Sequence, residues 1–379
     1  MKYTTCASRF AGLLGAVLIQ GINVEAQSPS PNIVKPPGGL ATPSSTVGSG
    51  PLFGVYRGPL AAPAVEAYEK WIGTQVSLGV EFAATDSWDK IEGPNWLLSP
   101  WAKWVKAQPG RRLMLSVPLL PGPWNGNGPT QGKGANEPVS LEKGAQGAFN
   151  VHFAELAKNL VAQGLGDSWL RLGWEFNGGW YTWRAGGKDQ AYAEYWRQIV
   201  KTMRAVPGAQ DLKFVWNPAL GYLGLPSEKA WPGDEFVDFV GIDIYDDSWV
   251  HDTYPWPEGT TPDAITARRK KTWQEALLNG NHGLTFWKKF AAEHHKPLGF
   301  PEWGVDNRKD KHGGMDDSHY VEQMHAFISD PKNNVAFHCY FDFQAPDGHH
   351  QLSPGANGVP TEFPEASAKF AELFGKPAK

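Results

Sequence analysis

Eight short apolar runs, alternating with segments of helical periodicity, constrain the fold of this chain more than any other feature. Most of these runs are continuously apolar, as strands buried on both faces are. They lie at residues 53–56, 76–82, 113–119, 169–174, 213–216, 237–245, 297–300 and 335–343. Apolar residues at helical spacing occur between them, at 64–74, 149–163, 191–206, 283–294 and 319–328. This alternation predicts an α/β fold, a (β/α)8 TIM barrel with long loops at the C-terminal face.

The N-terminal 50 residues are expected to lie outside this barrel. Residues 1–26 combine Lys2 and Arg9 with an apolar run and a small-residue cleavage site, which predicts a secretory signal peptide. The run is well below the roughly 20 residues of a membrane span, which disfavours an anchor. Residues 27–50 are rich in Pro, Ser, Thr and Gly, which predicts a flexible linker. We therefore expect one domain at 51–379, secreted to the extracellular space or periplasm.

Charge and cysteine content exclude several classes of partner. The formal net charge is -4 and there is no basic run, so neither nucleic acid nor, after signal cleavage, a membrane is an expected partner. Cys339 lies in an apolar run and is expected to be a buried small side chain. No P-loop, dinucleotide or G-x-S-x-G fingerprint occurs, and the histidine pairs lack zinc spacing. We expect a monomer without cofactor or metal; a Ca²⁺ loop at 246–252 is the disfavoured alternative.

Two glutamates carry most of the chemical information. Glu175 ends the fourth apolar run and Glu302 the seventh, and glycine and tryptophan follow both closely. Catalytic groups of parallel barrels lie at the C-terminal ends of strands, so the two carboxyl groups are expected to meet there. Cleavage of a sugar–sugar bond needs one protonated acid and a second carboxylate. Aromatic neighbours would desolvate the first and help to keep it protonated. A surface or salt-bridged carboxylate is the alternative for either residue.

Other polar residues near strand ends are weaker candidates. Tyr245 could hydrogen-bond a nucleophilic carboxylate, while Asp247 is expected to cap the following helix. Several further acids could bind sugar hydroxyls or be purely structural; they are Glu81, Asp86, Asp89, Asp243, Asp246 and Asp342.

The chain also has 18 tryptophans, and indole supplies a flat apolar surface for sugar rings. Helical positions place some of them in the core: Trp71, Trp196, Trp273 and Trp287. Others are expected in loops beside the strand ends: Trp88, Trp96, Trp124, Trp180, Trp183, Trp249, Trp256 and Trp303. About half of the loop tryptophans are expected only to cover the barrel end.

The stretch Arg171-Leu-Gly-Trp-Glu-Phe-Asn-Gly-Gly-Trp-Tyr-Thr-Trp183 resembles the acid/base segment of glycoside hydrolase family 26. Segments 240–245 and 214–218 look like the sixth and fifth strands of that family. The resemblance, which spans roughly residues 53–343, implies a retaining (β/α)8 enzyme, in most relatives an endo-β-1,4-mannanase. One residue departs from the pattern, because Trp174 stands where the family usually has histidine. The chain therefore looks like a divergent relative.

The resemblance implies Glu175 as acid/base and Glu302 as nucleophile. The residues that it implies for substrate binding are Arg171, Trp174, Asn177, Trp180, Trp183, Asn217, Tyr245 and Trp303. The implied function is a secreted glycoside hydrolase that cleaves β-linked polysaccharide, endo-acting on β-1,4-mannan or a related β-glycan. The alternatives are a β-glucanase, xylanase or exopolysaccharide hydrolase on the same barrel, a transglycosylase, or a non-catalytic sugar-binding protein.

Overall fold

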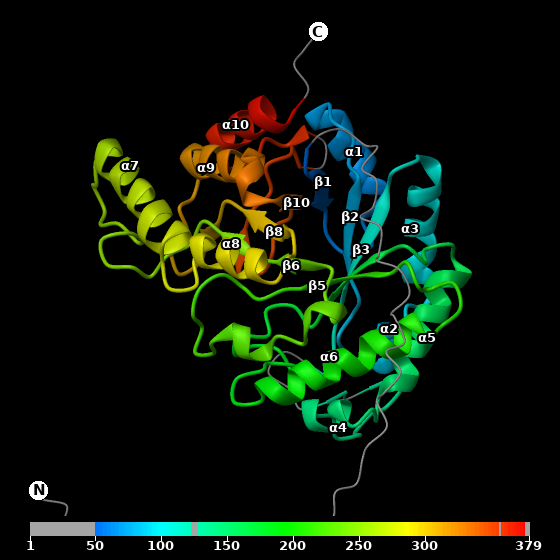
Figure 1. The fold of residues 1–379 in the computed structure, drawn as a ribbon. Coiled ribbons are helices and arrows are strands. Elements are labelled where there is room, and N and C mark those ends of the chain that lie inside the picture. The colour runs from blue at the N-terminus through cyan, green and yellow to red at the C-terminus, as the bar shows by residue number, and fades with distance from the viewer. Residues whose placement is uncertain (1–49, 123–127, 130, 356–357, 376–379) are drawn as a thin grey trace, which may run out of the picture. The chain divides into compact units, whose positions relative to one another are not determined.

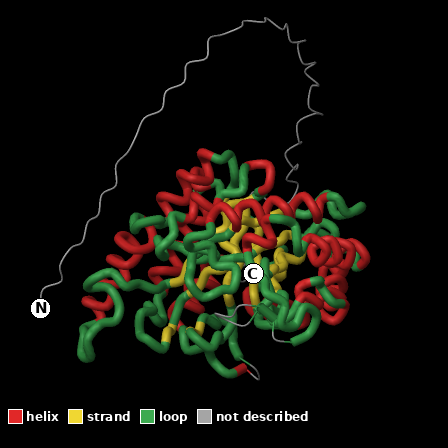
Figure 2. The backbone as a smooth tube through the Cα atoms, turned by 90° about the horizontal axis from the view of Figure 1, so that it is seen from below, coloured by secondary structure: helices red, strands yellow, loops and turns green. Residues whose placement is uncertain are grey.

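The computed structural model describes residues 50–122, 128–129, 131–355 and 358–375. The predicted signal peptide, Trp124 and all but the last residue of the predicted linker lie outside these ranges. Figures 1 and 2 show the strands gathered at the centre of the described domain with helices packed outside them. The central strands are β1 (Leu52–Tyr56), β2 (Leu78–Phe82), β3 (Arg112–Val117), β4 (Trp169–Leu172), β5 (Lys213–Trp216), β6 (Phe239–Gly241), β7 (Ile244–Tyr245), β8 (Leu298–Gly304) and β10 (Val335–Phe341).

These strands close into a parallel barrel. Each pairs with the next in the order β10-β1-β2-β3-β4-β5-β6-β8, and a pairing of β10 with β8 completes the circle. β6 and β7 both pair with β8 and occupy one strand position, so the barrel has eight positions. A separate antiparallel pair is formed by β9 (Asn307–Arg308) and β11 (Gly348–His349). The predicted (β/α)8 barrel is therefore confirmed.

Helices connect most of the strands on the outside of the barrel (Figure 1). They are α1 (Ala62–Ile72), α2 (Trp88–Ile91), α3 (Asn95–Ala107), α4 (Leu141–Ala145), α5 (Asn150–Ala162), α6 (Asp189–Arg204), α7 (Pro262–Lys271), α8 (Leu284–Glu293), α9 (Ser318–Ser329) and α10 (Pro364–Phe374), with a π-helix at Thr272–Leu278. All five predicted helices are present within about two residues of their expected ends. Among the described residues, none of the helices is both long and apolar enough to span a bilayer.

Two parts of the barrel differ from the sequence prediction. Only the short 3-10 turns Ser227–Ala230 and Asp234–Phe236 lie between β5 and β6, because prolines and glycines interrupt residues 217–236. The expected seventh strand ended at residue 300, before a proline. In the structure β8 runs through Pro301 and Glu302 to Gly304. Glu302 is therefore held in a strand and not on the loop beyond it.

The barrel interior is apolar at one end and polar at the other. Trp169 and Val215 lie in the apolar interior cluster, together with Leu78, Val80, Met114, Phe337 and Cys339. Strand side chains alternate with period two, so the same inward face of β4 and β5 presents Arg171 and Asn217 two residues later. The apolar layer supports the strands from below, and the carboxyl ends carry a buried polar layer. Cys339 is buried, as predicted.

Candidate active site

Arg171 is the centre of the polar layer and has no exposed surface. Its guanidinium donates to Ser116 Oγ at 3.1 Å and forms further hydrogen bonds to the side chains of Asn217 and Asp243. Nη2, the terminal nitrogen that binds Asp243, also lies 2.5 Å from Glu302 Oε1. Burial alone lowers the pKa of an arginine, but the charges of Asp243 and Glu302 raise that of Arg171 above its usual value. Arg171 therefore stays charged and fixes acidic side chains from two strand positions.

Glu302 is held at both carboxylate oxygens. Oε1 pairs with Arg171, and Oε2 accepts a 2.5 Å hydrogen bond from the Tyr245 hydroxyl. Its side chain is only 6% exposed, and its backbone belongs to β8. The predicted contact between Tyr245 and this carboxylate is thus present. Two charge-assisted contacts from different strands leave Glu302 little freedom to rotate.

Glu175 lies on a turn and has weaker support. The chain leaves β4 through Gly173, with φ 48°, and Glu175 itself has φ 51°, a left-handed conformation that is uncommon for a residue with a side chain. Its amide donates to Asn217 O at 2.8 Å, and its carboxylate accepts from Trp180 Nε1 at 2.9 Å. Such strained residues cluster at functional sites, where the surroundings hold them.

The pKa of Glu175 is raised to about 8, chiefly by burial and next by the negative charge of Glu302. The positive charge of Arg171 opposes these effects only in part. The two carboxyl groups therefore sit in contrasting surroundings. One is neutralised by a cation, and the other is kept protonated near neutral pH. A pair of this kind can protonate a leaving oxygen while its second member acts on carbon or on water.

Several residues predicted to touch substrate are interior. Arg171, Asn177, Asn217 and Trp303 are at most 2% exposed. The amide of Asn177 exchanges hydrogen bonds with the backbone of Ala219, and Asn217 binds Arg171. Trp303 packs against core aromatic rings and donates to His338. Their polar atoms are used inside the barrel, where these side chains position others. Direct contact between these residues and sugar stays a prediction.

Two of the remaining candidate acids, Glu81 and Asp342, have structural partners. Glu81 accepts from Trp101 Nε1 at 3.0 Å and from the amide of Leu60 at 2.8 Å. Asp342 pairs with Arg57 and accepts from Ser353. Within the described ranges, no three His, Cys, Asp or Glu side chains are grouped as metal ligands.

The tryptophans predicted for loops differ in position and exposure. The loop prediction is wrong for Trp88, Trp96 and Trp303, which lie in α2, α3 and β8. Trp88 and Trp183 are buried, whereas Trp96 is 50% and Trp249 is 61% exposed.

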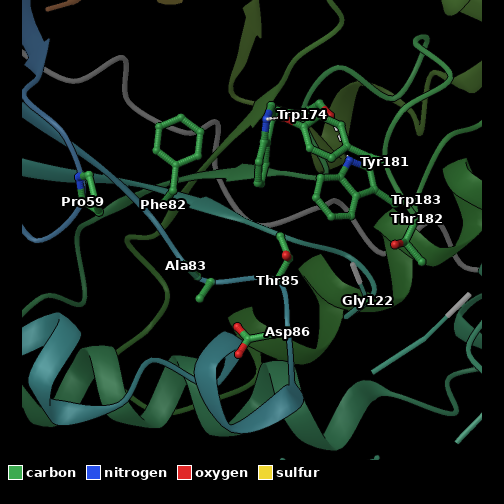
Figure 3. Close-up of a pocket in the computed structure, with 11 residues that line it drawn as sticks. Pro59, Phe82, Ala83, Thr85, Asp86, Gly122, Trp174, Tyr181, Thr182 and Trp183 are labelled. Carbon is green, nitrogen blue, oxygen red and sulfur yellow. Dashed lines mark hydrogen bonds between the residues drawn. The ribbon is translucent and has the colours of Figure 1, made fainter. Parts of the chain in front are cut away.

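A cleft of about 450 Å³ is lined in part by Trp174, the residue before Glu175 (Figure 3). We call it the aromatic cleft. It is lined by Pro59 after β1, residues 82–86 at the end of β2, Gly122 after β3, and Trp174 with residues 181–183 after β4. Sequence reasoning missed Phe82 and Tyr181 as lining residues. Period two along β2 could have placed Phe82 on the inward face, whereas Tyr181 has no signal beyond its place between Trp180 and Trp183.

The fold and site define a parallel-barrel protein with one carboxyl group on β8, paired with a buried arginine, and a second carboxyl group on the turn after β4. Residues 147–258, which include Arg171 and Glu175, match the family model for glycosyl hydrolase family 26. Over this segment the chain is family 26-like.

Individual relatives match the chain in part. Endoglucanase H of Acetivibrio thermocellus is 32% identical over 106 residues, which cover 26% of this chain and 12% of the relative. Mannan endo-1,4-beta-mannosidase of Bifidobacterium adolescentis is 33% identical over 86 residues, which cover 22% of this chain and 9% of the relative. The chain thus spans about a tenth of the length of these curated relatives. A Cellulomonas fimi endo-beta-1,4-mannanase double mutant superposes with a TM-score of 0.57 at 18% identity, covering 86% of this chain and 71% of the other, which supports the fold.

Proposed function

We propose that this protein is a retaining glycoside hydrolase that cleaves β-linked polysaccharide, endo-acting on β-1,4-mannan or a related β-glycan. The observation that carries the proposal is the contrast between its two carboxyl groups. Glu302 is paired with Arg171 and Tyr245, whereas burial raises the pKa of Glu175. A retaining mechanism needs this combination of an ionised nucleophile and a protonated acid.

In the first step, a carboxylate oxygen of Glu302 attacks the anomeric carbon and the glycosidic bond breaks. The proton of Glu175 moves to the leaving oxygen, so the departing sugar leaves as a neutral alcohol. The Arg171 guanidinium and the Tyr245 hydroxyl hold the Glu302 oxygens while one of them becomes covalently bound.

In the second step, Glu175, now ionised, removes a proton from water. The water oxygen attacks the anomeric carbon and releases Glu302, which regenerates both starting protonation states. Trp180 donates to the ionised form of Glu175 through its indole N–H. The charge that appears on Glu175 between the steps therefore has a partner.

The stereochemistry of the product tests the retaining mechanism. Proton NMR of freshly released oligosaccharide should show the β-anomer first, before mutarotation. This outcome requires the Glu175 and Glu302 carboxyl groups to lie about 5–5.5 Å apart. First appearance of the α-anomer would mean inversion, for which about 6.5–9.5 Å is expected.

A β-1,4-glucan is the second candidate substrate, and the similarity to Endoglucanase H favours it. Reducing-end release from mannan, glucomannan, carboxymethylcellulose and xylan separates these candidates. A rapid fall in viscosity relative to reducing ends indicates endo action. If none of these polymers is cut, the proposed substrate class is wrong.

We also propose that residues 1–26 direct secretion, that 27–50 form a linker, and that the mature protein acts as a monomer outside the cytoplasm. N-terminal sequencing of protein recovered from the medium or periplasm tests cleavage after Ala26. Light scattering tests the oligomeric state. Recovery of protein that still carries residues 1–26 would contradict the proposed secretion.

A further inference from the structure

The turn that carries Glu175 is joined to the chain after β5 at two places. The Glu175 amide donates to the Asn217 carbonyl at 2.8 Å, one residue beyond the end of β5. Two residues further along the turn, Asn177 Nδ2 donates to Ala219 O at 2.8 Å, and Asn177 Oδ1 accepts from Ala219 N at 2.9 Å. The side chain of Asn177 therefore binds both backbone polar groups of one residue, as a neighbouring strand would.

This pair of hydrogen bonds is buried. Asn177 is 2% exposed and Ala219 is 8% exposed. A substitution that removes the Asn177 amide therefore leaves the N–H and C=O of Ala219 without their partner and away from water. The chain can satisfy these groups again only by moving the turn or the segment after β5.

The segment after β5 is the more rigid of the two, because it continues the barrel beyond the strand. The backbone of Asp243 donates to Pro218 O at 3.3 Å and accepts from Leu220 N at 2.9 Å. Ala219 is thus paired in parallel with Asp243. When the bonds to Asn177 are lost, we expect the turn to move and the paired segment to stay.

The same segment supports Glu302 through a different group. Asn217 Oδ1 accepts from Arg171 Nε, and the Arg171 guanidinium binds the Glu302 carboxylate. The side chain of Asn217 therefore supports the proposed nucleophile, whereas the side chain of Asn177 supports the turn of the proposed acid. Substitution of these two asparagines can test the two supports separately.

The Glu175 turn needs a support that has direction. Glu175 has φ 51°, and such left-handed residues persist only where the surrounding structure holds them. The buried ring of Phe176 packs 4.4 Å from Tyr192 and 5.1 Å from Trp216, which fixes the position of the turn. Apolar contact is non-directional, whereas hydrogen bonds depend on angle. The Asn177 bonds therefore fix the rotation of the turn, and with it the direction of the Glu175 carboxyl group.

We propose that Asn177 is a positioning residue for proton transfer by Glu175: its side chain clamps the turn after β4 to residues 217–219 and so directs the Glu175 carboxyl group at the leaving oxygen. The inference rests on the proposed function and deepens it, because it assigns the acid a support that the nucleophile does not share.

The size of the expected effect follows from the role of the acid. Misplacement of a reacting group by about 1 Å can cost about 10²-fold in rate. General acid catalysis contributes about 10²- to 10⁴-fold in all. Asn177→Ala should therefore lower kcat/KM on polysaccharide by about 10²-fold, and by no more than Glu175→Ala does.

The test compares polysaccharide with an aryl glycoside whose leaving group departs without a proton. Asn177→Ala should lower kcat/KM on the aryl glycoside by less than about fivefold, since this departure does not use the acid. Asn217→Ala should lower both values alike, because its side chain supports Arg171 and the nucleophile. Equal losses on the two substrates in Asn177→Ala, or a change in KM alone, overturn the proposal.

Asn333→Ala is the matched control for the loss of a buried amide. Asn333 is 7% exposed, donates to Phe327 O at 2.8 Å, and precedes β10 at the end of the barrel opposite the carboxyl groups. It lies outside the lining of the aromatic cleft. This variant should have a lower Tm and an unchanged ratio of the two kcat/KM values. A change in the ratio as large as that of Asn177→Ala overturns the proposal.

Asn177→Asp carries the same test if Asn177→Ala does not fold, which circular dichroism reports. Aspartate keeps the size of the side chain and an acceptor for Ala219 N, but as a carboxylate it cannot donate to Ala219 O. We expect the loss on polysaccharide to exceed the loss on the aryl glycoside in this variant too. Equal losses again overturn the proposal.

Titration of the Glu175 carboxyl group distinguishes failure of this inference from failure of the proposed function. Burial is the chief cause of its raised pKa, so a released turn that admits water should let Glu175 titrate at lower pH in Asn177→Ala. Carbon-13 NMR of the carboxyl group measures this without substrate. A shift in a protein that cuts neither substrate would remove the proposed function and leave the clamp in place. Turnover by the native protein with an unchanged titration in the variant would remove the clamp alone.

Discussion

The two carboxyl groups at the barrel mouth have the same chemistry and opposite surroundings. Glu302 is part of a strand and is held by a cation and a phenol from other strands. Glu175 follows a strand on a left-handed turn and accepts from the indole of Trp180. A strand position with a buried cation stabilises a fixed carboxylate. A desolvated turn position stabilises a proton that can leave and return. The comparison shows that the surroundings of each glutamate, and not its residue type, decide whether its carboxyl group is suited to act as acid or as nucleophile.

The largest effect is expected from Glu302→Ala. Without this carboxylate no covalent intermediate forms, and we expect kcat to fall by about 10⁴-fold or more on polysaccharide and on activated aryl glycosides alike. Initial rates on both substrates measure this, with circular dichroism to check folding. Substantial residual turnover of a folded variant would mean that Glu302 is not the nucleophile.

Glu175→Ala is expected to separate the two substrates. Hydrolysis of polysaccharide should fall by about 10²- to 10⁴-fold, because the leaving sugar needs a proton. An aryl glycoside with an acidic leaving group needs none for its departure, so its first step should be nearly spared. Equal losses on the two substrates would contradict the assignment of Glu175 as the acid.

Tyr245→Phe should weaken the hold on Glu302 and leave the fold intact. Removal of a hydrogen bond to a charged group corresponds to about 1.5–3 kcal/mol, or roughly 10- to 150-fold in kcat/KM. We expect the loss mainly in kcat, because the contact serves the reacting carboxylate. Tyr222→Phe is the control, since that tyrosine is on an exposed loop. A change in KM alone would argue for substrate binding by Tyr245.

The smallest expected effect concerns pH. Glu175 must be protonated to act as the acid, so kcat/KM should decline as pH rises through its raised pKa, about 8. The Trp180 hydrogen bond favours the ionised form and lowers the pKa. Trp180→Phe should therefore move the basic limb to higher pH. A shift to lower pH, or a limb that persists in Glu175→Gln, would rule out this origin.

Much of the fold could be predicted because strands and helices leave local patterns of apolar residues in the sequence. The apolar runs and helical spacings located the strands and five helices, since burial on both faces of a parallel strand leaves a continuous apolar signature. α3 and α10 were not predicted, and β8 was expected to end before Pro301. Proline usually ends a strand, but here the pairing with β10 continues beyond it to Trp303.

The site was predictable in its residue types but not in their partners. The sequence by itself determined that Glu175 and Glu302 end up near the carboxyl ends of two barrel strands, because strand ends follow from periodicity. Only the tertiary structure decided that Arg171, Asn177, Asn217 and Trp303 face inward, and that Phe82 and Tyr181 line a cleft. The reason is physical. Whether a polar side chain meets a substrate or another side chain depends on contacts between segments far apart in the chain, such as the pairing of Arg171 with Glu302.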